Sequence, residues 1–261
     1  MLLYIIAYTF LKINKKGDFM FCFNIKIAEV TFLIRANYLT TKVYFEDFLT
    51  NEKAEIDINV SKYEIHSFKK KVSYFTDEMC ERGVLKYKID RSLVNYGVFP
   101  LHASALSYHE DAYVFTALSG GGKSTHSRLW KETFGNDVKI INDDRPYLKV
   151  TEKDIYAFSH PQSGTHRLYT NTSCPVRVIG KIVKDKDNYV KRLSKADFFP
   201  FLVQQTFTMD DPNTTKKIIS LIKKALDHVF LYEIHCNTNY DAASLIYEQI
   251  DKDIKQSKHP L

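Results

Sequence analysis

A glycine-rich segment that ends in lysine contains the strongest chemical signal in this sequence. Residues 117–125 are Ala-Leu-Ser-Gly-Gly-Gly-Lys-Ser-Thr. Consecutive glycines let the backbone turn its N–H groups toward one point, and the N-terminus of a following helix attracts phosphate. Lys123 would then lie over the β- and γ-phosphates of a nucleoside triphosphate, and the Ser124 hydroxyl would be placed to bind Mg²⁺. The segment predicts a phosphate-binding loop for ATP made of Ser119, Gly120, Gly121, Gly122, Lys123, Ser124 and Thr125.

The first position of this segment departs from the usual pattern. A phosphate-binding loop has the spacing G-x-x-x-x-G-K-[ST], and here Ala117 replaces the first glycine. The surroundings still support the assignment, because an apolar run at 113–117 predicts a buried strand and residues 124–134 predict an amphipathic helix closed by Gly135. The alternative, a glycine-rich hairpin turn, rarely leads into a helix.

Two adjacent carboxylates, Asp143 and Asp144, follow Asn142 at the end of the next predicted strand, 138–141. Adjacent acids at the end of a buried strand require positive charge nearby, which a metal ion on the phosphates would supply. One carboxylate would bind this metal while the other accepts a proton from an attacking hydroxyl. Asp144 is the candidate metal ligand, although the residues leave open which aspartate takes which role. The alternative is a polar turn before Pro146, and the preceding loop favours the functional interpretation.

A histidine precedes the phosphate loop by one strand. His102 lies at the start of the predicted strand 101–107, immediately before the strand of the loop along the chain. Neighbouring strands would bring His102 close to the acidic pair. Taken alone, a histidine on a buried strand is more often a core residue than a catalytic one.

Composition limits the class of protein. The 261 residues are 44% hydrophobic, enough for one large domain or for a main domain with a smaller one attached. The net charge of +6 is dispersed, and pairs such as Lys216 and Lys217 indicate solvated faces, so we expect no nucleic-acid partner. The four cysteines are scattered. Their spacing argues against a zinc knuckle or a disulfide framework and favours a cytoplasmic location.

The first residues form an apolar run at 1–11. This run is too short to span a bilayer, which needs about twenty residues. Basic residues follow the run instead of preceding it, the reverse of a secretory signal, so we expect no membrane association. Residues 1–19 are interpreted as an extension, an edge strand or the product of an upstream start, since Met20 is an alternative first residue.

The remaining pattern divides the chain into two regions. Residues 20–98 predict a small β-rich region, and residues 99–261 predict an ATP-binding α/β domain in three layers. In the first region we expect strands at 21–27, 30–34 and 56–60, a helical piece at 44–48 and a helix at 84–95. In the second we expect strands at 101–107, 113–117, 138–141, 147–150, 155–158, 176–183 and 230–235, a hairpin turn at 108–111, and helices at 124–134, 214–228 and 241–252.

The order of these motifs resembles a known family. His102-Ala-Ser-Ala, Ser-Gly-Gly-Gly-Lys-Ser-Thr and Asn142-Asp-Asp are together similar to the C-terminal catalytic domain of HPr kinase/phosphorylase and, more distantly, to ATP-dependent phosphoenolpyruvate carboxykinase. The chain looks most like an unassigned bacterial branch of HPr-kinase-like proteins, in which His-Ala-Ser-Ala, Gly-Lys-Ser-Thr-His, Leu-Trp and Asp-Asp recur. The resemblance extends over about 99–247. It implies an α/β fold: a P-loop catalytic domain of the HPr kinase/phosphoenolpyruvate carboxykinase type with a small β-rich N-terminal lobe.

The resemblance also implies a role for each matching residue. The glycines and Lys123 would hold the phosphates, Ser124 would bind the metal, and His102 would support the paired aspartates. Arg167, or alternatively His166, would stabilise the transferred phosphate from a downstream loop, unless it is a surface residue. The arginine-rich substrate segments of a carboxykinase and the segment that docks the phosphocarrier protein are not recognisable. Their absence from the pattern argues against decarboxylating activity and against HPr itself as the acceptor.

The predicted function is that of an ATP-dependent kinase that transfers the γ-phosphate to a hydroxyl, such as serine in a peptide, a protein or a small metabolite. The resemblance makes a homo-oligomer and a reverse phosphorolysis reaction conceivable, but the residues decide neither and do not identify the acceptor. The alternative is a non-catalytic nucleotide-binding accessory or regulatory protein. The presence of His102, Asp143 and Asp144 favours chemistry, because a binding module does not need them.

Overall fold

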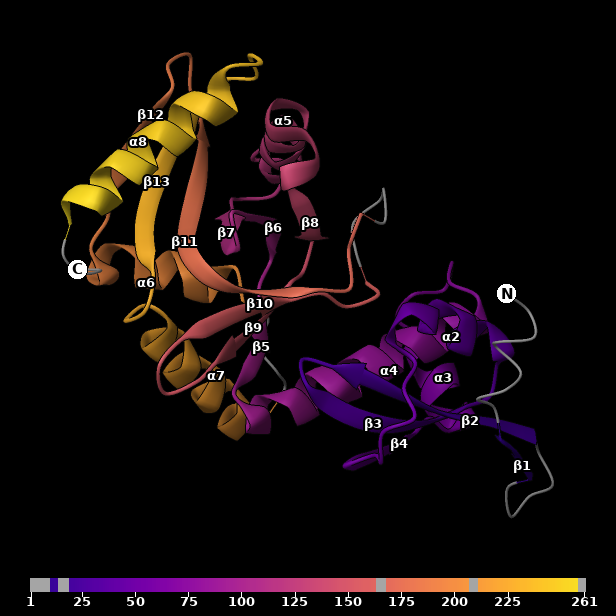
Figure 1. Cartoon of the computed structure of the whole chain (residues 1–261). Helices are drawn as coiled ribbons and strands as arrows, with labels where there is room; N and C mark the ends of the chain where they lie inside the picture. The colour runs from indigo at the N-terminus through magenta and orange to yellow at the C-terminus, as the bar shows by residue number, and fades with distance from the viewer. Residues whose placement is uncertain (1–9, 14–18, 163–167, 207–210, 258–261) are drawn as a thin grey trace. The chain divides into compact units, whose positions relative to one another are not determined.

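The chain forms two compact units, Met1–Tyr96 and Gly97–Leu261. The computed structural model describes residues 10–13, 19–162, 168–206 and 211–257 (Figure 1). Both units combine helices and strands, so the coarse prediction of a mixed α/β protein is confirmed. Among the described residues, no helix is long and apolar enough to cross a membrane.

The first unit is built on a four-stranded sheet in the order β1-β2-β3-β4. The strands are β1 (Phe10–Ile13), β2 (Phe19–Ile27), β3 (Val30–Ala36) and β4 (Ile56–Asn59). The first three strands pair antiparallel, whereas β4 runs parallel to β3. The helices are α2 (Leu39–Tyr44), α3 (Lys62–Lys69) and α4 (Asp77–Leu93), with short 3₁₀ turns at Glu46–Phe48 and Val94–Tyr96.

This unit contains more helix than the sequence pattern predicted. The helical piece expected at 44–48 is in fact the end of α2 and a 3₁₀ turn, and the helix expected at 84–95 begins at Asp77. Helix α3 was missed, although a capping box marks its start: Ser61 accepts from the Glu64 N–H, and the Glu64 carboxylate accepts from the Ser61 N–H. The sheet predicted for this region is present, and the sequence pattern underestimated the helices packed with it.

The second unit is built on a nine-stranded mixed sheet. Its main path runs β5-β9-β10-β11-β7-β6-β8, and β13 pairs with both β11 and β12. The strands are β5 (Val98–Pro100), β6 (Ala103–Tyr108), β7 (Asp111–Thr116), β8 (Lys139–Asn142), β9 (Tyr147–Val150), β10 (Ile155–Phe158), β11 (Ser173–Lys184), β12 (Tyr189–Arg192) and β13 (Phe230–Cys236). The helices are α5 (Lys123–Phe134), α6 (Lys195–Gln204), α7 (Pro212–Ala225) and α8 (Ala242–Gln256), with a 3₁₀ turn at Gly135–Asp137.

Strand direction determines which residues meet at one edge of this sheet. Strands β7, β11 and β13 are parallel to one another. Strand β6 is antiparallel to both β7 and β8, so β8 also runs in the direction of β7. The carboxyl ends of β7, β8, β11 and β13 therefore lie at one edge, together with the amino end of β6. In open α/β sheets this edge is where ligands bind.

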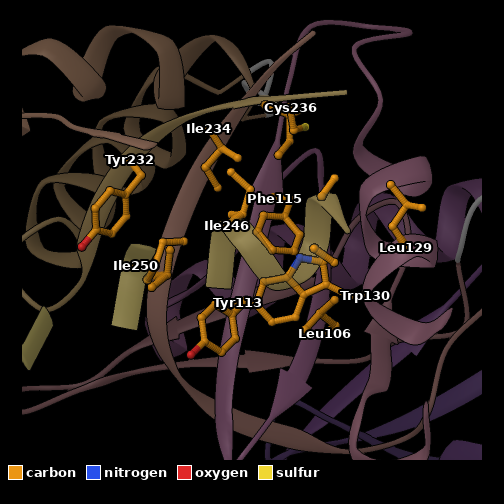
Figure 2. Packing of buried hydrophobic residues seen from close by; sticks show 14 of the residues in the cluster. Leu106, Tyr113, Phe115, Leu129, Trp130, Tyr232, Ile234, Cys236, Ile246 and Ile250 are labelled. Carbon is orange, nitrogen blue, oxygen red and sulfur yellow. The ribbon is translucent and has the colours of Figure 1, made fainter. Parts of the chain in front are cut away.

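Helices α5 and α8 pack against one face of the sheet and enclose the main core of the unit (Figure 2). Trp130 of α5 is completely buried, and its ring lies 4.8 Å from that of Tyr113 and 5.5 Å from that of Phe115. Ile246 and Ile250 of α8 complete this layer. Full burial of one such side chain stabilises the fold by about 1.5–3 kcal/mol. The helix that follows the glycine-rich segment is thus held rigidly against the sheet.

The opposite face of the sheet is covered by other helices. Helix α7 packs against β5 and β9, and α6 places Phe201 against the Lys181 ammonium of β11 at 5.2 Å. The sequence pattern predicted α7, β13 and α8 to within four residues at each end. It missed β5, α6 and β12. Pro200 lies inside α6. Because proline disfavours helix interiors, the sequence pattern did not predict a helix here.

Candidate functional site

The glycine-rich segment forms a tight turn between β7 and α5. Gly120 and Gly122 have φ of +71° and +100°, values that other residues rarely adopt. The Gly121 N–H donates to the Leu118 carbonyl at 2.8 Å. A Cβ at Gly121 would lie 2.6 Å from the Ala117 Cβ and 2.8 Å from the Leu118 oxygen, so only glycine fits there. The turn predicted from the sequence is present, and α5 begins at Lys123, one residue before its expected start.

No described side chain caps the start of α5. Its N-cap is Gly122, which has no side chain that could accept from the first N–H groups. The His126 N–H donates to the Gly122 carbonyl at 2.9 Å, which sets the first turn of the helix. The N–H groups of a first helical turn have no partners within the helix, and they carry the positive end of its dipole.

A cavity of about 340 Å³ adjoins this helix start. Besides residues of the loop and of the first turns of α5, it is lined by the ends of two parallel strands, through Ile182, Lys184, Cys236, Asn237 and Thr238. The Lys184 Cε lies 3.8 Å from the position of a Cβ at Gly122, so the Lys184 side chain passes close to the glycine turn. Asn237 is held by Asn188 and by the Lys186 carbonyl, which fixes the loop after β13.

Lys123 lines this cavity, and its side chain reaches His102, the residue directly before β6. Its Nζ lies 3.0 Å from Nε2 of His102, and only 9% of Lys123 is exposed. Burial lowers the pKa of Lys123, while the Asp144 carboxylate opposes that shift. Burial also lowers the pKa of His102, and the nearby Lys123 charge lowers it further. The imidazole of His102 is therefore neutral at physiological pH.

Of the two aspartates, Asp144 faces this histidine. Its Oδ1 lies 3.9 Å from Nε2 of His102, and its Oδ2 lies 3.4 Å from Nε of Arg145. Asp143 is 5% exposed, whereas the Asp144 side chain is 30% exposed. The structure thus separates a buried from an accessible carboxylate in a pair that the sequence left equivalent.

Asn142 sets the direction of Asp144. Its Oδ1 accepts from the N–H groups of Asp144 at 3.1 Å and Arg145 at 2.8 Å, and its Nδ2 donates to the carbonyls of His160 and Gln162. The Asn142 side chain is completely buried, and all these contacts are made at the end of β8. This turn directs the Asp144 side chain back toward β6.

The structure brings together most of the residues that the sequence singled out. His102, Lys123 and Asp144 meet at the sheet edge defined above, with the glycine turn beside them. Ser119 and Ser124 are exposed and Thr125 is half-buried. Arg167 and His166 lie outside the described residues.

Several residues at this edge were not anticipated from the sequence. Gln205, at the end of α6, places its Oε1 3.1 Å from Nδ1 of His102. Arg145 directly follows the acidic pair, a position visible in the sequence but not considered. Lys184 directly follows the predicted strand 176–183 and could have been found, but only if that strand had been recognised as parallel to β7.

His126, which also lines the cavity, has a structural role. Its ring is buried, with Nε2 accepting from Trp130 Nε1 at 3.0 Å and Nδ1 lying 3.6 Å from the Cys236 sulfur. Burial lowers the pKa of His126 to about 3. It also raises the pKa of Cys236 to about 11, so neither side chain ionises near neutral pH.

Comparisons with known proteins give little beyond the fold. No protein-family model and no curated protein matches the chain. Among solved structures, the chain is similar to the HPr(Ser) kinase/phosphatase from Coxiella burnetii, with 11% identity over 60% of this chain and 97% of that one. The TM-score of 0.35 makes this a weak likeness, of fold at most, which assigns no residue and no activity.

Proposed function

We propose that this protein is an ATP-dependent phosphotransferase of the HPr-kinase type that transfers the γ-phosphate to a hydroxyl group. The observation that supports the proposal most is the position of Lys123. Its ammonium belongs to a glycine turn that opens onto a cavity, and it also contacts the histidine that faces Asp144. A cation between an anion-binding turn and a carboxylate is the arrangement that phosphoryl transfer requires.

The arrangement favours one orientation of the nucleotide. The cavity lies on the β11 and β13 side of the glycine turn, whereas His102 and Asp144 lie on the β6 and β8 side. The nucleoside and its first phosphates would occupy the cavity, near Lys184 and Thr238. The γ-phosphate would then lie at Lys123, with the acceptor hydroxyl on the side of Asp144.

Each residue has a defined task in this reaction. The N–H groups of the glycine turn and the Lys123 ammonium would bind the phosphate oxygens and stabilise the charge that develops on them. Asp144, the accessible carboxylate, would accept the proton of the hydroxyl. The hydroxyl oxygen forms a bond to the γ-phosphorus while the bond from that phosphorus to the bridging β–γ oxygen breaks, and ADP leaves.

The residues present also fit a magnesium ion. No three His, Cys, Asp or Glu side chains gather into a metal site within the described ranges. Mg²⁺ in nucleotide sites typically takes one or two protein oxygens and completes its shell with phosphate and water. With Asp144 acting as the base, the exposed Ser124 hydroxyl would provide one such protein oxygen. The ion would supply positive charge beside the transferred phosphate.

The proposal is tested by incubating the purified protein with γ-labelled ATP and Mg²⁺ against a peptide library, HPr and free serine. Label transferred by the wild type but not by Lys123→Met would establish the activity and reveal the acceptor class. Tight ATP binding without transfer to any acceptor would overturn the proposal in favour of a nucleotide-binding accessory protein.

A further inference from the structure

The end of helix α6 is bonded to the segment Leu101–His102, which lies between β5 and β6. The His102 N–H donates to the Gln205 carbonyl at 2.9 Å, and Leu101 forms a β-bridge with Thr206. The Thr206 hydroxyl donates back to the Leu202 carbonyl at 2.8 Å, which closes the last turn of the helix. Gln205 is 7% exposed. These main-chain contacts hold the Gln205 side chain beside the imidazole ring.

The two nitrogens of His102 have partners of opposite kind. Nε2 lies 3.0 Å from the Lys123 ammonium, which can only donate, so Nε2 must accept. A neutral imidazole that accepts at Nε2 has its proton on Nδ1. Nδ1 lies 3.1 Å from the Gln205 Oε1, which can only accept. Both contacts thus require the same tautomer, with the proton on Nδ1.

We propose that Gln205 is a positioning residue that fixes the His102 proton on Nδ1 and so keeps the Nε2 lone pair directed toward Lys123 and Asp144. The partner of one ring nitrogen determines the protonation of the other. If the Lys123 ammonium turns to a phosphate, Gln205 is the contact that still enforces this tautomer.

The tautomer matters for the carboxylate opposite. A proton on Nε2 would be shared with the Asp144 Oδ1, now 3.9 Å away, and would occupy the oxygen that has to accept the hydroxyl proton. With the proton on Nδ1, this oxygen stays free. This consequence rests on the proposed function, whereas the tautomer itself does not.

Nitrogen NMR of protein labelled at its histidines tests the assignment directly. The His102 signals are identified by their loss in His102→Asn. We expect the protonated-nitrogen shift at Nδ1 and the lone-pair shift at Nε2 in the wild type and in Lys123→Met, where Gln205 remains at hydrogen-bond distance from the ring and the Asp144 carboxylate lies farther away. In Lys123→Met/Gln205→Met the proton moves to Nε2. The matched control Lys123→Met/Gln204→Met, which alters the exposed neighbour, keeps the wild-type pattern.

A proton on Nε2 in Lys123→Met, or no change when Gln205 is also replaced, would overturn the assignment. Activity supplies the second readout. We expect Gln205→Met to lower kcat by about ten-fold or more, with KM for ATP nearly unchanged, and Gln204→Met to alter neither. Equal kcat for the two variants would contradict a positioning role. A wild type that transfers no phosphate would sink the proposed function, while the NMR comparison would still decide the tautomer.

Discussion

The Nζ of Lys123 lies 3.0 Å from Nε2 of His102, so the lysine after the glycine turn donates to the histidine directly before β6. This contact joins the start of α5 to the residue before β6, at the edge where the carboxyl ends of the parallel strands lie. Asp144 approaches the same imidazole from β8 at 3.9 Å. The contact follows from strand direction, because antiparallel β6 places His102 between the ends of β7 and β8.

Lys184 should contribute to nucleotide affinity. Its side chain passes within 3.8 Å of the position of a Gly122 Cβ and lines the cavity. We expect Lys184→Met to weaken ATP binding by about ten- to a hundred-fold, since one charge-assisted hydrogen bond contributes roughly 1.5–3 kcal/mol. The measurement is titration calorimetry with a non-hydrolysable ATP analogue. Lys186→Met, which removes an exposed lysine two residues away, should bind as the wild type does, and equal losses in both variants would contradict the orientation proposed for the nucleotide.

The two glycines at the ends of helix α5 allow the effects of alanine on stability and on ATP affinity to be compared. Gly122 at the N-cap has φ of +100° and Gly135 at the C-cap has φ of +59°. Alanine at either position should destabilise the fold by about 1–2 kcal/mol through backbone strain. Only Gly122→Ala should also reduce ATP affinity, because it disturbs the N–H groups of the turn. Thermal melts and binding titrations on both variants check this, and a Gly122→Ala protein with wild-type affinity would argue against an anion site at the turn.

Asn142→Asp should destabilise the second unit although the two side chains have the same shape. Nδ2 of Asn142 donates to the carbonyls of His160 and Gln162, and a carboxylate oxygen there would face both acceptors without a proton. The buried His160 carbonyl would lose its donor at a cost of about 1–3 kcal/mol, and the half-buried Gln162 carbonyl would add a smaller cost. Urea denaturation measures the effect. An unchanged free energy of unfolding would show that the turn before Asp144 does not depend on this amide.

The buried His126 should make stability depend on pH. Burial holds its pKa at about 3 in the folded chain, whereas a free imidazole has a pKa of about 6.5. Between these values the unfolded chain binds a proton that the folded chain does not. The free energy of unfolding therefore falls as the pH is lowered from the unfolded pKa to the folded pKa of His126, by up to about 1.4 kcal/mol per pH unit from this residue. Above the unfolded pKa this contribution no longer changes with pH. The free energy of unfolding of His126→Gln should fall less steeply than that of the wild type, and parallel curves would refute this origin.

Local patterns were sufficient to predict the loop and the helix after it. Glycines, apolar runs and caps act within a few residues, so the turn at Gly120–Gly122 and the helix closed by Gly135 could be read directly. The hairpin between β6 and β7 was also expected, and it is made by His109 and Glu110 with φ of +49° and +67°. The acidic pair was placed near His102 by the same reasoning about neighbouring strands.

The contacts that depend on tertiary structure were not predictable in this way. Gln205 is 103 residues from His102 along the chain, and α6 contains a proline that masks its helical pattern. The difference between Asp143 and Asp144 arises from the turn at Asn142, whose partners His160 and Gln162 come from a later segment. Lys184 reaches the cavity only because β11 is parallel to β7. No short-range signal in the sequence encodes these relationships.

The most direct test of the account compares wild type with Asp144→Asn, the accessible carboxylate that faces His102. Transfer of γ-phosphate from labelled ATP is measured in parallel with equilibrium binding of a non-hydrolysable analogue, using the acceptor found for the wild type. Loss of the group that accepts the hydroxyl proton should lower the rate of transfer by about 10²-fold or more. The account predicts this loss with nucleotide binding weakened far less. Transfer by Asp144→Asn at the wild-type rate would contradict it.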